Sequence, residues 1–556
     1  VGEKTALDLD LVGAEIGTDK MRVTVIDPSG DALVKELPIG VRPTSPDVIE
    51  SELIGLAPGE SITLDAARFE GMIPNAGSLT LAAGPLARLN VPELLIKLDR
   101  YPYGCAEQIT SRALPLLYLA EVASMLDMGS ASDIDQRIED AIEALLAKQT
   151  STGGFGLWSA NEYYTALWLD AYVTDFLIRA EAEGYDVPQL ALERALDAIA
   201  NQLSYASDFD AGGEDIAYAL YVSARAGRAA IGDLRYYYEA RLDNFGTPLA
   251  KAQIGAALAL YGDKSRAASA FEAAVASLTE ADDPRRWRTD YGSQLRDAAA
   301  VLALAAEFIP SGLDLPALTG WLGELRDAET YTSTQEDAWT LLAAAAAGRG
   351  QELQSITVDD QPHEESAYRR FTQSELTVAP VTIANNGNRP TELKISVTGV
   401  PRTPPAADAN GFKLSRTFYR LDGTPFDPVT EPVQQNDRFV VLLQASAANL
   451  GSGQYMLADW LPAGFEIENP DLSAGAGVGD LKWLSVSTPE HSEARTDSYL
   501  AAFRYTTPVE RFSSAYMVRA VSPGTFTLPG ATVEDMYRPE QRANTGGGTV
   551  VIAPAD

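Results

Sequence analysis

The sequence has 556 residues, of which 46% are hydrophobic and 22% are charged, and this composition is typical of a globular protein with several domains. Its formal net charge of −35 argues against binding to nucleic acids or to anionic lipid surfaces. A single cysteine excludes a disulfide framework, and no apolar run reaches the ~18 residues of a membrane-spanning helix. No signal-peptide pattern opens the chain, and strand-like sequence follows Val1 almost directly, so we expect a fragment or mature piece of a longer protein.

Residues 1–90 show the alternation of apolar and polar residues that is typical of half-buried β-strands. The alternation is clearest at 7–11 and 21–25, and residues 27–30 have the composition of a turn. Prolines near residue 43 indicate a boundary. Further short strands are predicted near 47–55, 60–65 and 77–84.

From about residue 91 to about residue 350 the apolar period becomes helical. Predicted helix starts include a cap at Asn161, a capping-box pattern that begins at Ser132, and Thr247 followed by proline at the first helical position. We expect roughly eleven or twelve helices of ~10–18 residues with short connections. Such an arrangement predicts a solenoid, or a solenoid closed into a toroid.

The only cysteine of the chain lies in the run Tyr-Pro-Tyr-Gly-Cys-Ala-Glu-Gln at residues 101–108. If the chain is helical from Cys105 onward, the Gln108 side chain lies one turn away on the same face. At that spacing the thiol can attack the carboxamide carbon and expel ammonia. The product would be an internal thioester, which is a far better acyl donor than an amide.

The residues just before Cys105 bear on the reactivity and the protection of such a bond. Pro102 and Gly104 prevent a regular helix there, so we expect a bent and partly strained turn. Water would destroy a thioester unless apolar or aromatic neighbours excluded it. Tyr101 and Tyr103 are candidates for that role.

Two simpler interpretations of Cys105 remain open. A lone cysteine is commonly a small buried hydrophobic residue. A protease-type cysteine needs a base to form its thiolate, and the two histidines of the chain, His363 and His491, are distant in sequence and form no Cys/His signature. A Cys–His hydrolase is therefore disfavoured.

The segment Cys105-Ala106-Glu107-Gln108 resembles the Cys-x-Glu-Gln thioester signature of the α2-macroglobulin and complement superfamily. The full run at 101–108 is similar to the bacterial α2-macroglobulins in particular, and the resemblance extends over essentially the whole chain. It implies a multidomain fold in which an all-α (α/α) toroid carries the thioester. The toroid would be inserted in a β CUB-like domain and flanked by macroglobulin-like β-sandwich domains. The thioester would join Cys105 and Gln108, with Tyr101, Tyr103, Gly104 and Glu107 as motif and shielding residues.

The resemblance also implies domain boundaries, which follow the changes of period. They are the closing strands of a macroglobulin-like domain at 1–43, the first part of the CUB-like domain at 44–90, the toroid at 91–350, the second part of the CUB-like domain at 351–400 and the C-terminal macroglobulin-like sandwich at 401–556.

Two further segments resemble α/α toroids. Residues 149–155 are similar to a Gln-x-x-x-Gly-Gly-Phe turn found in terpenoid cyclases and in thioester domains, and residues 334–339 are similar to a helix start near the end of such domains. Each segment alone could be only a good turn or cap. A cyclase would need an acidic catalytic or metal-binding motif at the mouth of the toroid, and we identify none.

The distribution of histidine bears on the acceptor of the acyl group. In some complement relatives, a histidine downstream in this domain helps to transfer the acyl group to hydroxyls. Here no histidine occurs between residues 1 and 362. The resemblance therefore implies direct reaction with amines, lysine side chains above all.

The chain returns to strand-like sequence after residue 350. Residues 376–378 and 393–397 are predicted to complete the CUB-like domain, and residues 401–411 have the composition of a linker. His363 is assigned to a solvated loop, because a zinc motif would need a second histidine at 367. The C-terminal domain has predicted strands at 412–421, 438–445, 454–460, 499–505 and 514–520.

Residues 533–540 resemble a turn of the C-terminal domain of the bacterial proteins. Met536 and Tyr537 in this segment are either an ordinary packing pair or a cover for the thioester. We expect the second arrangement, in which Met536 supplies flexible apolar cover beside Tyr101 or Tyr103.

The resemblance implies a broad-spectrum protease inhibitor and not an enzyme. A protease would cut a bait segment N-terminal to this chain, and the uncovered thioester would then couple to its lysines. No cofactor or metal is expected. The family is typically periplasmic and often lipid-anchored at an N-terminal cysteine, which this chain would lack, and association with a peptidoglycan synthase is a further expectation. Two rivals remain, a thioester-bearing adhesin or opsonin-like module and an interaction protein with an unreactive Cys105.

Overall fold

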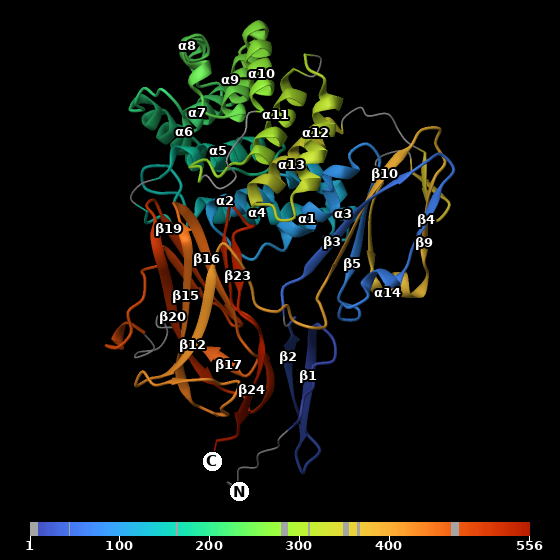
Figure 1. Ribbon diagram of the computed structural model, residues 1–556, viewed down its shortest axis with the longest axis vertical. Coiled ribbons are helices and arrows are strands. Elements are labelled where there is room, and N and C mark those ends of the chain that lie inside the picture. Colours follow the sequence, from blue (N-terminus) through green and yellow to red (C-terminus); the bar gives the residue numbers. More distant parts are fainter. Residues whose placement is uncertain are drawn as a thin grey trace.

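The structure is a computed structural model that describes residues 9–43, 45–162, 165–279, 287–309, 312–348, 355–363, 367–468 and 478–555. Figure 1 shows a mass of helices above two β-structured regions that lie side by side, with an N-terminal hairpin beside them. The expected domain boundaries at 43/44 and 350/351 involve residues outside the described ranges.

The N-terminal strands β1 (Gly17–Ile26) and β2 (Ala32–Val41) form an antiparallel hairpin around the predicted turn. The strand predicted at 7–11 is not found. Residues 7 and 8 lie outside the described ranges, and residues 9–11 have no strand structure. Leu9 and Leu11 are 56% and 62% exposed, so the alternating pattern has no neighbouring sheet to cover it here.

Strands from both sides of the helical segment pair with one another. Val48–Leu56 (β3) and Ser78–Ala83 (β5) flank Thr391–Gly399 (β10) in one four-stranded sheet, and Ala367–Thr372 (β8) extends it. The facing sheet contains β4 (Ser61–Leu64), β9 (Val381–Asn385), β6 (Ile356–Val358) and β7 (Gln361–His363). Apolar residues of both sheets form one core, so the helical segment is an excursion from a single β-sandwich.

The strand predicted at 376–378 is wrong. These residues belong to the short helix α14 (Gln373–Val378), which Thr372 and Glu375 start with a reciprocal capping box. The capping residues decide the structure of this segment, because three apolar or β-branched residues in a row do not distinguish a strand from a helix.

The helical part contains thirteen α-helices within the described residues, one more than the upper end of the prediction. Helices α2, α5, α7, α9, α11 and α13 contact one another in succession, and α13 returns to α2, which closes a ring. The remaining helices lie against this ring, as in an α/α toroid. The helices are α1 (Val91–Asp99), α2 (Ala106–Ala113), α3 (Leu116–Met125), α4 (Ala131–Leu146), α5 (Leu167–Ala182), α6 (Gln189–Ser204), α7 (Glu214–Arg225), α8 (Ile231–Arg241), α9 (Pro248–Leu260), α10 (Lys264–Ser277), α11 (Gln294–Phe308), α12 (Leu315–Ala328) and α13 (Thr334–Ala347).

The predicted helix starts are confirmed in one case and corrected in two. Thr247 caps α9 through a hydrogen bond from the Ala250 N–H to its hydroxyl. Helix α4 begins two residues earlier than expected, because Ser130 and Asp133 form its capping box. Asn161 does not cap a helix, since α5 begins only after Ala166.

The C-terminal part is a β-sandwich whose main sheets have the orders β11-β23-β22-β16-β19-β18 and β13-β12-β15-β20-β17. Its strands are β11 (Asp408–Asn410), β12 (Lys413–Arg420), β13 (Pro425–Phe426), β14 (Val433–Gln434), β15 (Arg438–Leu450), β16 (Gly453–Trp460), β17 (Phe465–Ile467), β18 (His491–Ala494), β19 (Ser498–Tyr505), β20 (Val509–Ala520), β21 (Gly524–Leu528), β22 (Thr532–Asp535), β23 (Arg542–Asn544) and β24 (Gly548–Ala553). All five strands predicted here are present, to within a few residues.

One face of this sandwich packs against the toroid. Met456 and Ala458 on β16 and Leu500 and Ala502 on β19 belong to the same apolar cluster as the core of the helices. Figure 1 shows the upper ends of β16 and β19 just below helix α2. The start of α2 is therefore buried between the toroid and the C-terminal sandwich. No helix in the described part of the chain combines the length and the apolar character needed to span a membrane.

Candidate functional site

Cys105 is the N-cap residue of helix α2, and Gln108 is its third helical residue. The two residues form a capping box, in which the Cys105 side chain accepts from the Gln108 N–H and Gln108 Oε1 accepts from the Cys105 N–H at 3.1 Å. The thiol and the carboxamide therefore both lie at the N-terminus of the helix. This juxtaposition is the one expected from the sequence, although Cys105 precedes the helix and is not part of it.

The strain that we predicted before Cys105 is not found at that residue. Cys105 has φ −70° and ψ 164°, which are ordinary extended values for an N-cap. Helix α1 ends at Asp99, and the non-helical residues 100–104, which include Pro102 and Gly104, lead the chain into α2. The geometry of the cap, and not backbone distortion, brings the two side chains together.

Both side chains are removed from water. Cys105 and Gln108 are each 0% exposed. Burial, together with the nearby Glu107 carboxyl, raises the pKa of the Cys105 thiol far above its ordinary value. The thiol is thus uncharged at neutral pH, in contrast to the thiolate of a cysteine protease.

Tyr101 and Met536 cover the Gln108 amide from opposite ends of the sequence. Gln108 Nε2 lies 3.4 Å from Tyr101 Oη and 3.6 Å from Met536 Sδ. Tyr103 is buried and packs edge-to-face on Tyr101, with ring centroids 5.3 Å apart. Met536 therefore lies where the cover was predicted, beside an aromatic side chain of the segment at 101–108.

Glu107 connects the helix start to two other parts of the chain. Its carboxylate accepts hydrogen bonds from Ser111 Oγ at 2.6 Å, Gln335 Nε2 at 2.7 Å and Tyr537 Oη at 2.7 Å. Thr334 Oγ1 adds a contact of 3.1 Å to each carboxylate oxygen. Burial raises the pKa of Glu107, and these donors partly offset that effect. Glu107 thus fixes α2 against the start of α13 and against the C-terminal loop.

The loop after β22 is itself held firmly. Tyr537 stacks on Tyr291 with ring centroids 4.4 Å apart. The Met536 N–H donates to Gln454 O at 2.9 Å, and Arg538 Nε donates to Asp535 Oδ2 at 2.8 Å. Three parts of the chain that are distant in sequence, α2, α13 and the loop at 536–537, therefore meet around the buried start of α2.

The predicted toroid turn also supports the site. Gln149 Nε2 donates to Gly153 O at 3.0 Å and to Ala191 O at 2.9 Å, which fixes the turn. Gly153 has φ +96°, and a Cβ there would lie 2.3 Å from Arg194 O, so only glycine fits. The segment that follows places Leu157 O 2.7 Å from the Ala106 N–H, next to Cys105.

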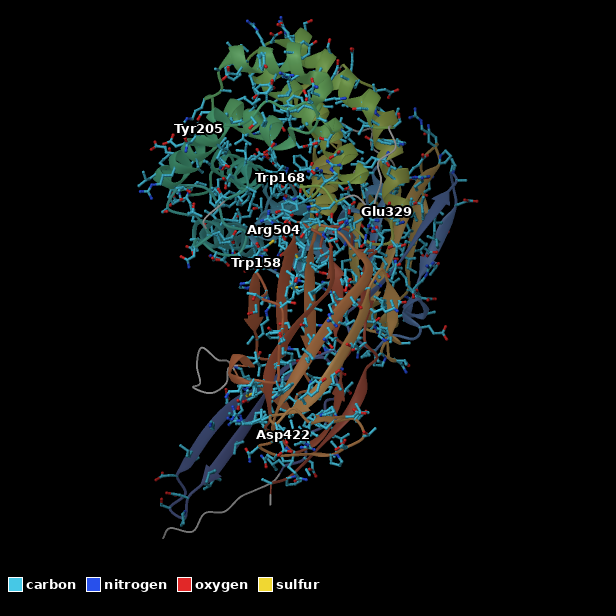
Figure 2. All side chains as sticks on the ribbon, turned by 60° about the vertical axis from the view of Figure 1, so that its left-hand side comes forward. Trp158, Trp168, Tyr205, Glu329, Asp422 and Arg504 are labelled. Carbon is cyan, nitrogen blue, oxygen red and sulfur yellow. The ribbon has the colours of Figure 1, made fainter. Side chains whose placement is uncertain are left out.

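The two histidines of the chain lie on β-strands, His491 on β18 and His363 on β7. His491 stacks on Trp158 with ring centroids 4.7 Å apart, and burial lowers its pKa. His363 ends β7, in the sandwich that the helices interrupt. No hydrogen bond among the described residues joins Cys105 to a histidine. Figure 2 places Trp158, Arg504 and Glu329 along the boundary between the toroid and the C-terminal sandwich.

The sequence analysis missed several residues of the site. Ser111, Thr334, Gln335 and Tyr291 were not assigned to it. Ser111 was recoverable, because it lies four residues after Glu107 on the same helix. The others are brought in only by tertiary packing. No group of three or more potential metal ligands occurs within the described ranges.

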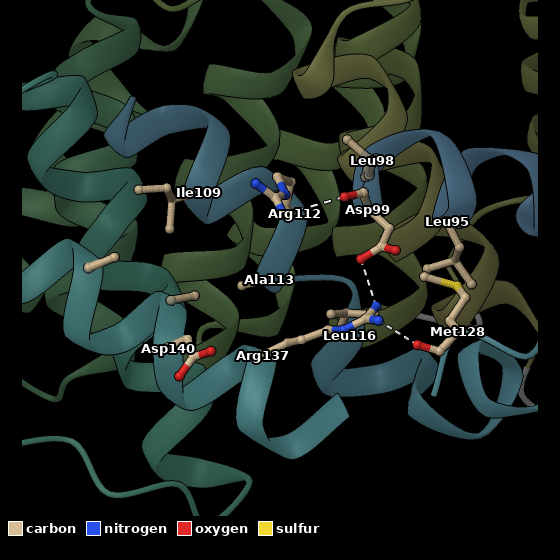
Figure 3. A pocket seen from close by; sticks show the side chains of 12 residues that line it. Leu95, Leu98, Asp99, Ile109, Arg112, Ala113, Leu116, Met128, Arg137 and Asp140 are labelled. Carbon is tan, nitrogen blue, oxygen red and sulfur yellow. Dashed lines mark hydrogen bonds and ion pairs between the residues drawn. The ribbon is translucent and has the colours of Figure 1, made fainter. Parts of the chain in front are cut away.

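The opposite face of α2 borders a separate hollow of about 220 Å³. Figure 3 shows Arg137 reaching Asp99 and the Met128 carbonyl there, with Arg112 directed at the Asp99 carbonyl. Ile109 and Arg112 face this hollow, whereas Gln108 and Ser111 face the buried site. The two faces of α2 are thus chemically separate.

Comparisons with known proteins agree with this architecture. Residues 411–540 match the family model described as the bacterial α2-macroglobulin MG10 domain. The α2-macroglobulin of Escherichia coli K12 is 31% identical over 551 residues, which covers 93% of this chain and 32% of that protein. The α2-macroglobulin of Xylella fastidiosa Temecula1 is 29% identical, covering 99% of this chain and 35% of that protein. The chain thus spans about a third of the length of these relatives.

Two solved structures are similar over almost the whole chain. The native E. coli α2-macroglobulin from domain MG7 to the C-terminus has a TM-score of 0.84 at 28% identity, covering 97% of this chain and 88% of that one. Salmonella α2-macroglobulin reacted with methylamine has a TM-score of 0.83 at 30% identity, covering 97% of this chain and 36% of that one. The chain therefore belongs to the bacterial α2-macroglobulin family and matches the C-terminal part of these proteins.

Proposed function

We propose that Cys105 and Gln108 form an internal thioester that captures amines, and that the chain acts as the covalent arm of a protease trap. The observation that carries this proposal is the capping box, which places the Cys105 and Gln108 side chains at the same helix start in a fully buried site. Formation of the bond joins Cys105 Sγ to the Gln108 acyl carbon, and the amide nitrogen leaves as ammonia with the thiol proton.

The contacts around Gln108 support both protection and rearrangement. Its amide nitrogen is covered by Met536, which belongs to a different domain from Cys105. Any motion that separates the C-terminal sandwich from the toroid removes Met536 and exposes the acyl group. Bait cleavage elsewhere in a longer protein is the proposed cause of that motion, so the native state is a metastable switch.

The coupling step is an acyl transfer without an enzymatic turnover. A lysine amine of the attacking protease attacks the Gln108 acyl carbon, the C–S bond breaks with its electron pair on Cys105 Sγ, and one nitrogen proton neutralises the sulfur. The product is a γ-glutamyl-lysyl isopeptide and a free Cys105 thiol. No hydrogen bond among the described residues joins Cys105 to a histidine, so we propose amines and not hydroxyls, which need a base, as the acceptors.

Protease capture tests this function in the full-length protein. The expected product is a covalent conjugate in which Gln108 is linked to a lysine of the protease, identified by peptide mass spectrometry. The trapped protease should still cleave small substrates but not large ones. A protein that attaches to cell surfaces but leaves proteases fully active would instead be an adhesin and would contradict the proposal.

Cellular location and partners beyond proteases are proposed from the resemblance alone. They are residence in the periplasm, a lipid anchor on a longer chain and association with a peptidoglycan synthase. Cell fractionation and affinity capture of the full-length protein test them, and recovery in the cytoplasm would contradict the first.

A further inference from the structure

The hollow of about 220 Å³ on the far side of α2 has a mostly apolar lining. Helices α1, α2, α3 and α4 and the segment after α3 all contribute to it. Leucine, isoleucine, methionine and alanine side chains make up most of its walls, among them Leu98, Ile109 and Leu116. Asp99, Arg112, Arg137 and Asp140 are its charged residues. The hollow thus combines an apolar interior with a few groups that can recognise charge.

The volume of the hollow suits a ring-sized apolar group. A cavity of about 150 Å³ lined by leucine, isoleucine and phenylalanine binds benzene. A hollow of about 220 Å³ therefore admits a benzene-sized ring that carries a short chain of further atoms. Small-molecule sites in general have apolar walls and a small number of polar groups that fix the orientation of the ligand.

Three of the four charged side chains in the hollow already have partners. Arg137 donates to Asp99 Oδ1 at 2.6 Å and also to the Met128 carbonyl, as Figure 3 shows. Asp140 Oδ1 accepts a hydrogen bond from Gln136 Nε2 at 2.8 Å. These three groups are therefore occupied in holding α1, α4 and the segment after α3 in place.

Arg112 is different from these groups. Its side chain is partly buried, and its hydrogen bond to the Asp99 carbonyl is long, at 3.4 Å. The Asp99 carboxylate pairs with Arg137, and no ion pair joins Arg112 to a carboxylate within the described ranges. Burial lowers the pKa of Arg112, Asp99 opposes this effect and Arg137 adds to it, but a guanidinium stays charged at neutral pH. A partly buried cation without a carboxylate partner is complementary to an anion.

We propose that this hollow binds small aromatic carboxylates, with the ring among the aliphatic side chains of α1, α2 and α4 and the carboxylate on the Arg112 guanidinium. A guanidinium can donate two parallel hydrogen bonds to one carboxylate. Asp140, which would repel an anion, lies well apart from Arg112 in Figure 3. The site is on the face of α2 away from Gln108, so this inference goes beyond amine capture and does not depend on the thioester.

Calorimetric titration of the whole chain with 3-phenylpropionate tests the inference. We expect binding to the wild type with a dissociation constant below about 1 mM. R112M should weaken it at least about tenfold, because hydrogen bonds to a charged group are lost while the apolar stem of the side chain is kept. The neutral analogue 3-phenylpropanamide should bind the wild type at least about tenfold more weakly than the acid does, and it should bind R112M and the wild type equally.

A second variant tests the space and not the charge. Ala144 is partly buried on α4 and lines the hollow, so the larger side chain in A144L would occupy the place of the ring while Arg112 is unchanged. A144L should lose binding of both the acid and the amide. In the wild type, 3-phenylpropionate should slow amide hydrogen exchange at residues 106–113 and 137–144, which places the ligand between α2 and α4.

The matched control is R194M, because Arg194 is exposed on α6 and lies outside the hollow. It should bind 3-phenylpropionate as the wild type does. No binding by the wild type, equal binding by R112M, or tighter binding of the cation 3-phenylpropylammonium would overturn the inference. A loss of binding in R194M would also overturn it, since the anion would then be held elsewhere. Failure of methylamine to release a thiol would instead overturn the proposed thioester and leave this inference standing.

Discussion

The Cys105 N–H donates to Gln108 Oε1 at 3.1 Å while the Cys105 side chain accepts from the Gln108 N–H. An ordinary capping box satisfies backbone groups at a helix start, but here its two side chains are also a nucleophile and an acyl group. The N–H that holds the carbonyl oxygen would also stabilise the oxyanion that forms when sulfur or an amine attacks the carbon. One local motif can therefore both start α2 and prepare the reaction.

The capping role predicts how substitutions at Cys105 separate stability from reactivity. Cys105→Ser keeps a side-chain cap and should unfold close to the wild-type temperature. Cys105→Ala removes the cap and should lose about 1 kcal/mol of unfolding free energy. Neither variant should incorporate methylamine. Thermal unfolding followed by circular dichroism and methylamine labelling measure the two effects, and labelling of either variant would contradict the role of Cys105.

The cover over Gln108 predicts faster hydrolysis when Met536 is shortened. Met536→Ser removes the thioether that lies 3.6 Å from Gln108 Nε2 and opens a path for water. We expect faster spontaneous thiol release, with a loss of about 2–5 kcal/mol of stability. Met125→Ser is the matched control, because Met125 is 50% exposed at the end of α3. Equal release of thiol from both variants over hours would show that Met536 does not protect the bond.

The Tyr537–Glu107 hydrogen bond predicts a link between domain docking and protection. Tyr537→Phe removes the 2.7 Å donor to a buried carboxylate and should cost about 1.5–3 kcal/mol. Because Tyr537 also stacks on Tyr291, the phenyl ring should keep the loop in place. Denaturant unfolding measures the loss. In a Glu107→Gln background the same substitution should cost much less, and an equal cost there would exclude the direct bond as the cause.

The raised pKa of Glu534, a partly buried carboxyl on β22, predicts that the free energy of unfolding depends on pH. Its pKa rises from 4.5 to about 7 on folding, so the folded state binds its proton more tightly than the unfolded state does. Stability should therefore fall as pH rises from 4.5 to about 7 and stay lower above that window. E534Q should remove this part of the slope and raise the free energy of unfolding at pH 8 by about 1–2 kcal/mol.

The control for this pH effect is E143Q, because Glu143 is exposed on α4. It should leave the slope of stability against pH unchanged. A wild-type slope retained in full by E534Q would mean that other buried carboxyls, such as Glu107 or Asp535, carry the dependence.

Helix α2 offers a test of whether the two faces of one helix act independently. Arg112 lies on the face away from Gln108 and lines the hollow in Figure 3. Arg112→Met should preserve amine capture within about twofold, because its only described hydrogen bond is a 3.4 Å contact with the Asp99 carbonyl. Capture assays and melting temperature report the two properties. Loss of capture in a protein that melts normally would contradict the separation.

Much of the site was predictable because its residues are close in sequence. Cys105 and Gln108 are three positions apart, so a helix start alone brings them together. Glu107 was assigned to the motif, but its donors Gln335 and Tyr537 come from segments more than 200 residues away. No local pattern distinguishes such partners from ordinary polar residues of a helix start and a loop.

The errors in the fold prediction have physical causes of the same kind. The prediction of a strand at 376–378 was wrong because Thr372 and Glu375 cap a helix there. The prediction of strain at Cys105 was wrong because this residue has the ordinary extended conformation of an N-cap, which leads the chain into α2 without distortion. The strands between residues 412 and 556 were predicted correctly. Both main sheets are antiparallel and bury one face of each strand against a large core, so the sequence alternates between apolar and polar residues.

The mass of the peptide that contains residues 101–108, measured in freshly purified native protein, tests the central claim most directly. The proposed bond predicts a mass lower by one ammonia molecule, no alkylation of Cys105, and the appearance of one alkylatable thiol together with one methylamide at Gln108 after treatment with methylamine. An unmodified mass, with Cys105 freely alkylated after denaturation and no methylamine incorporated, would contradict it.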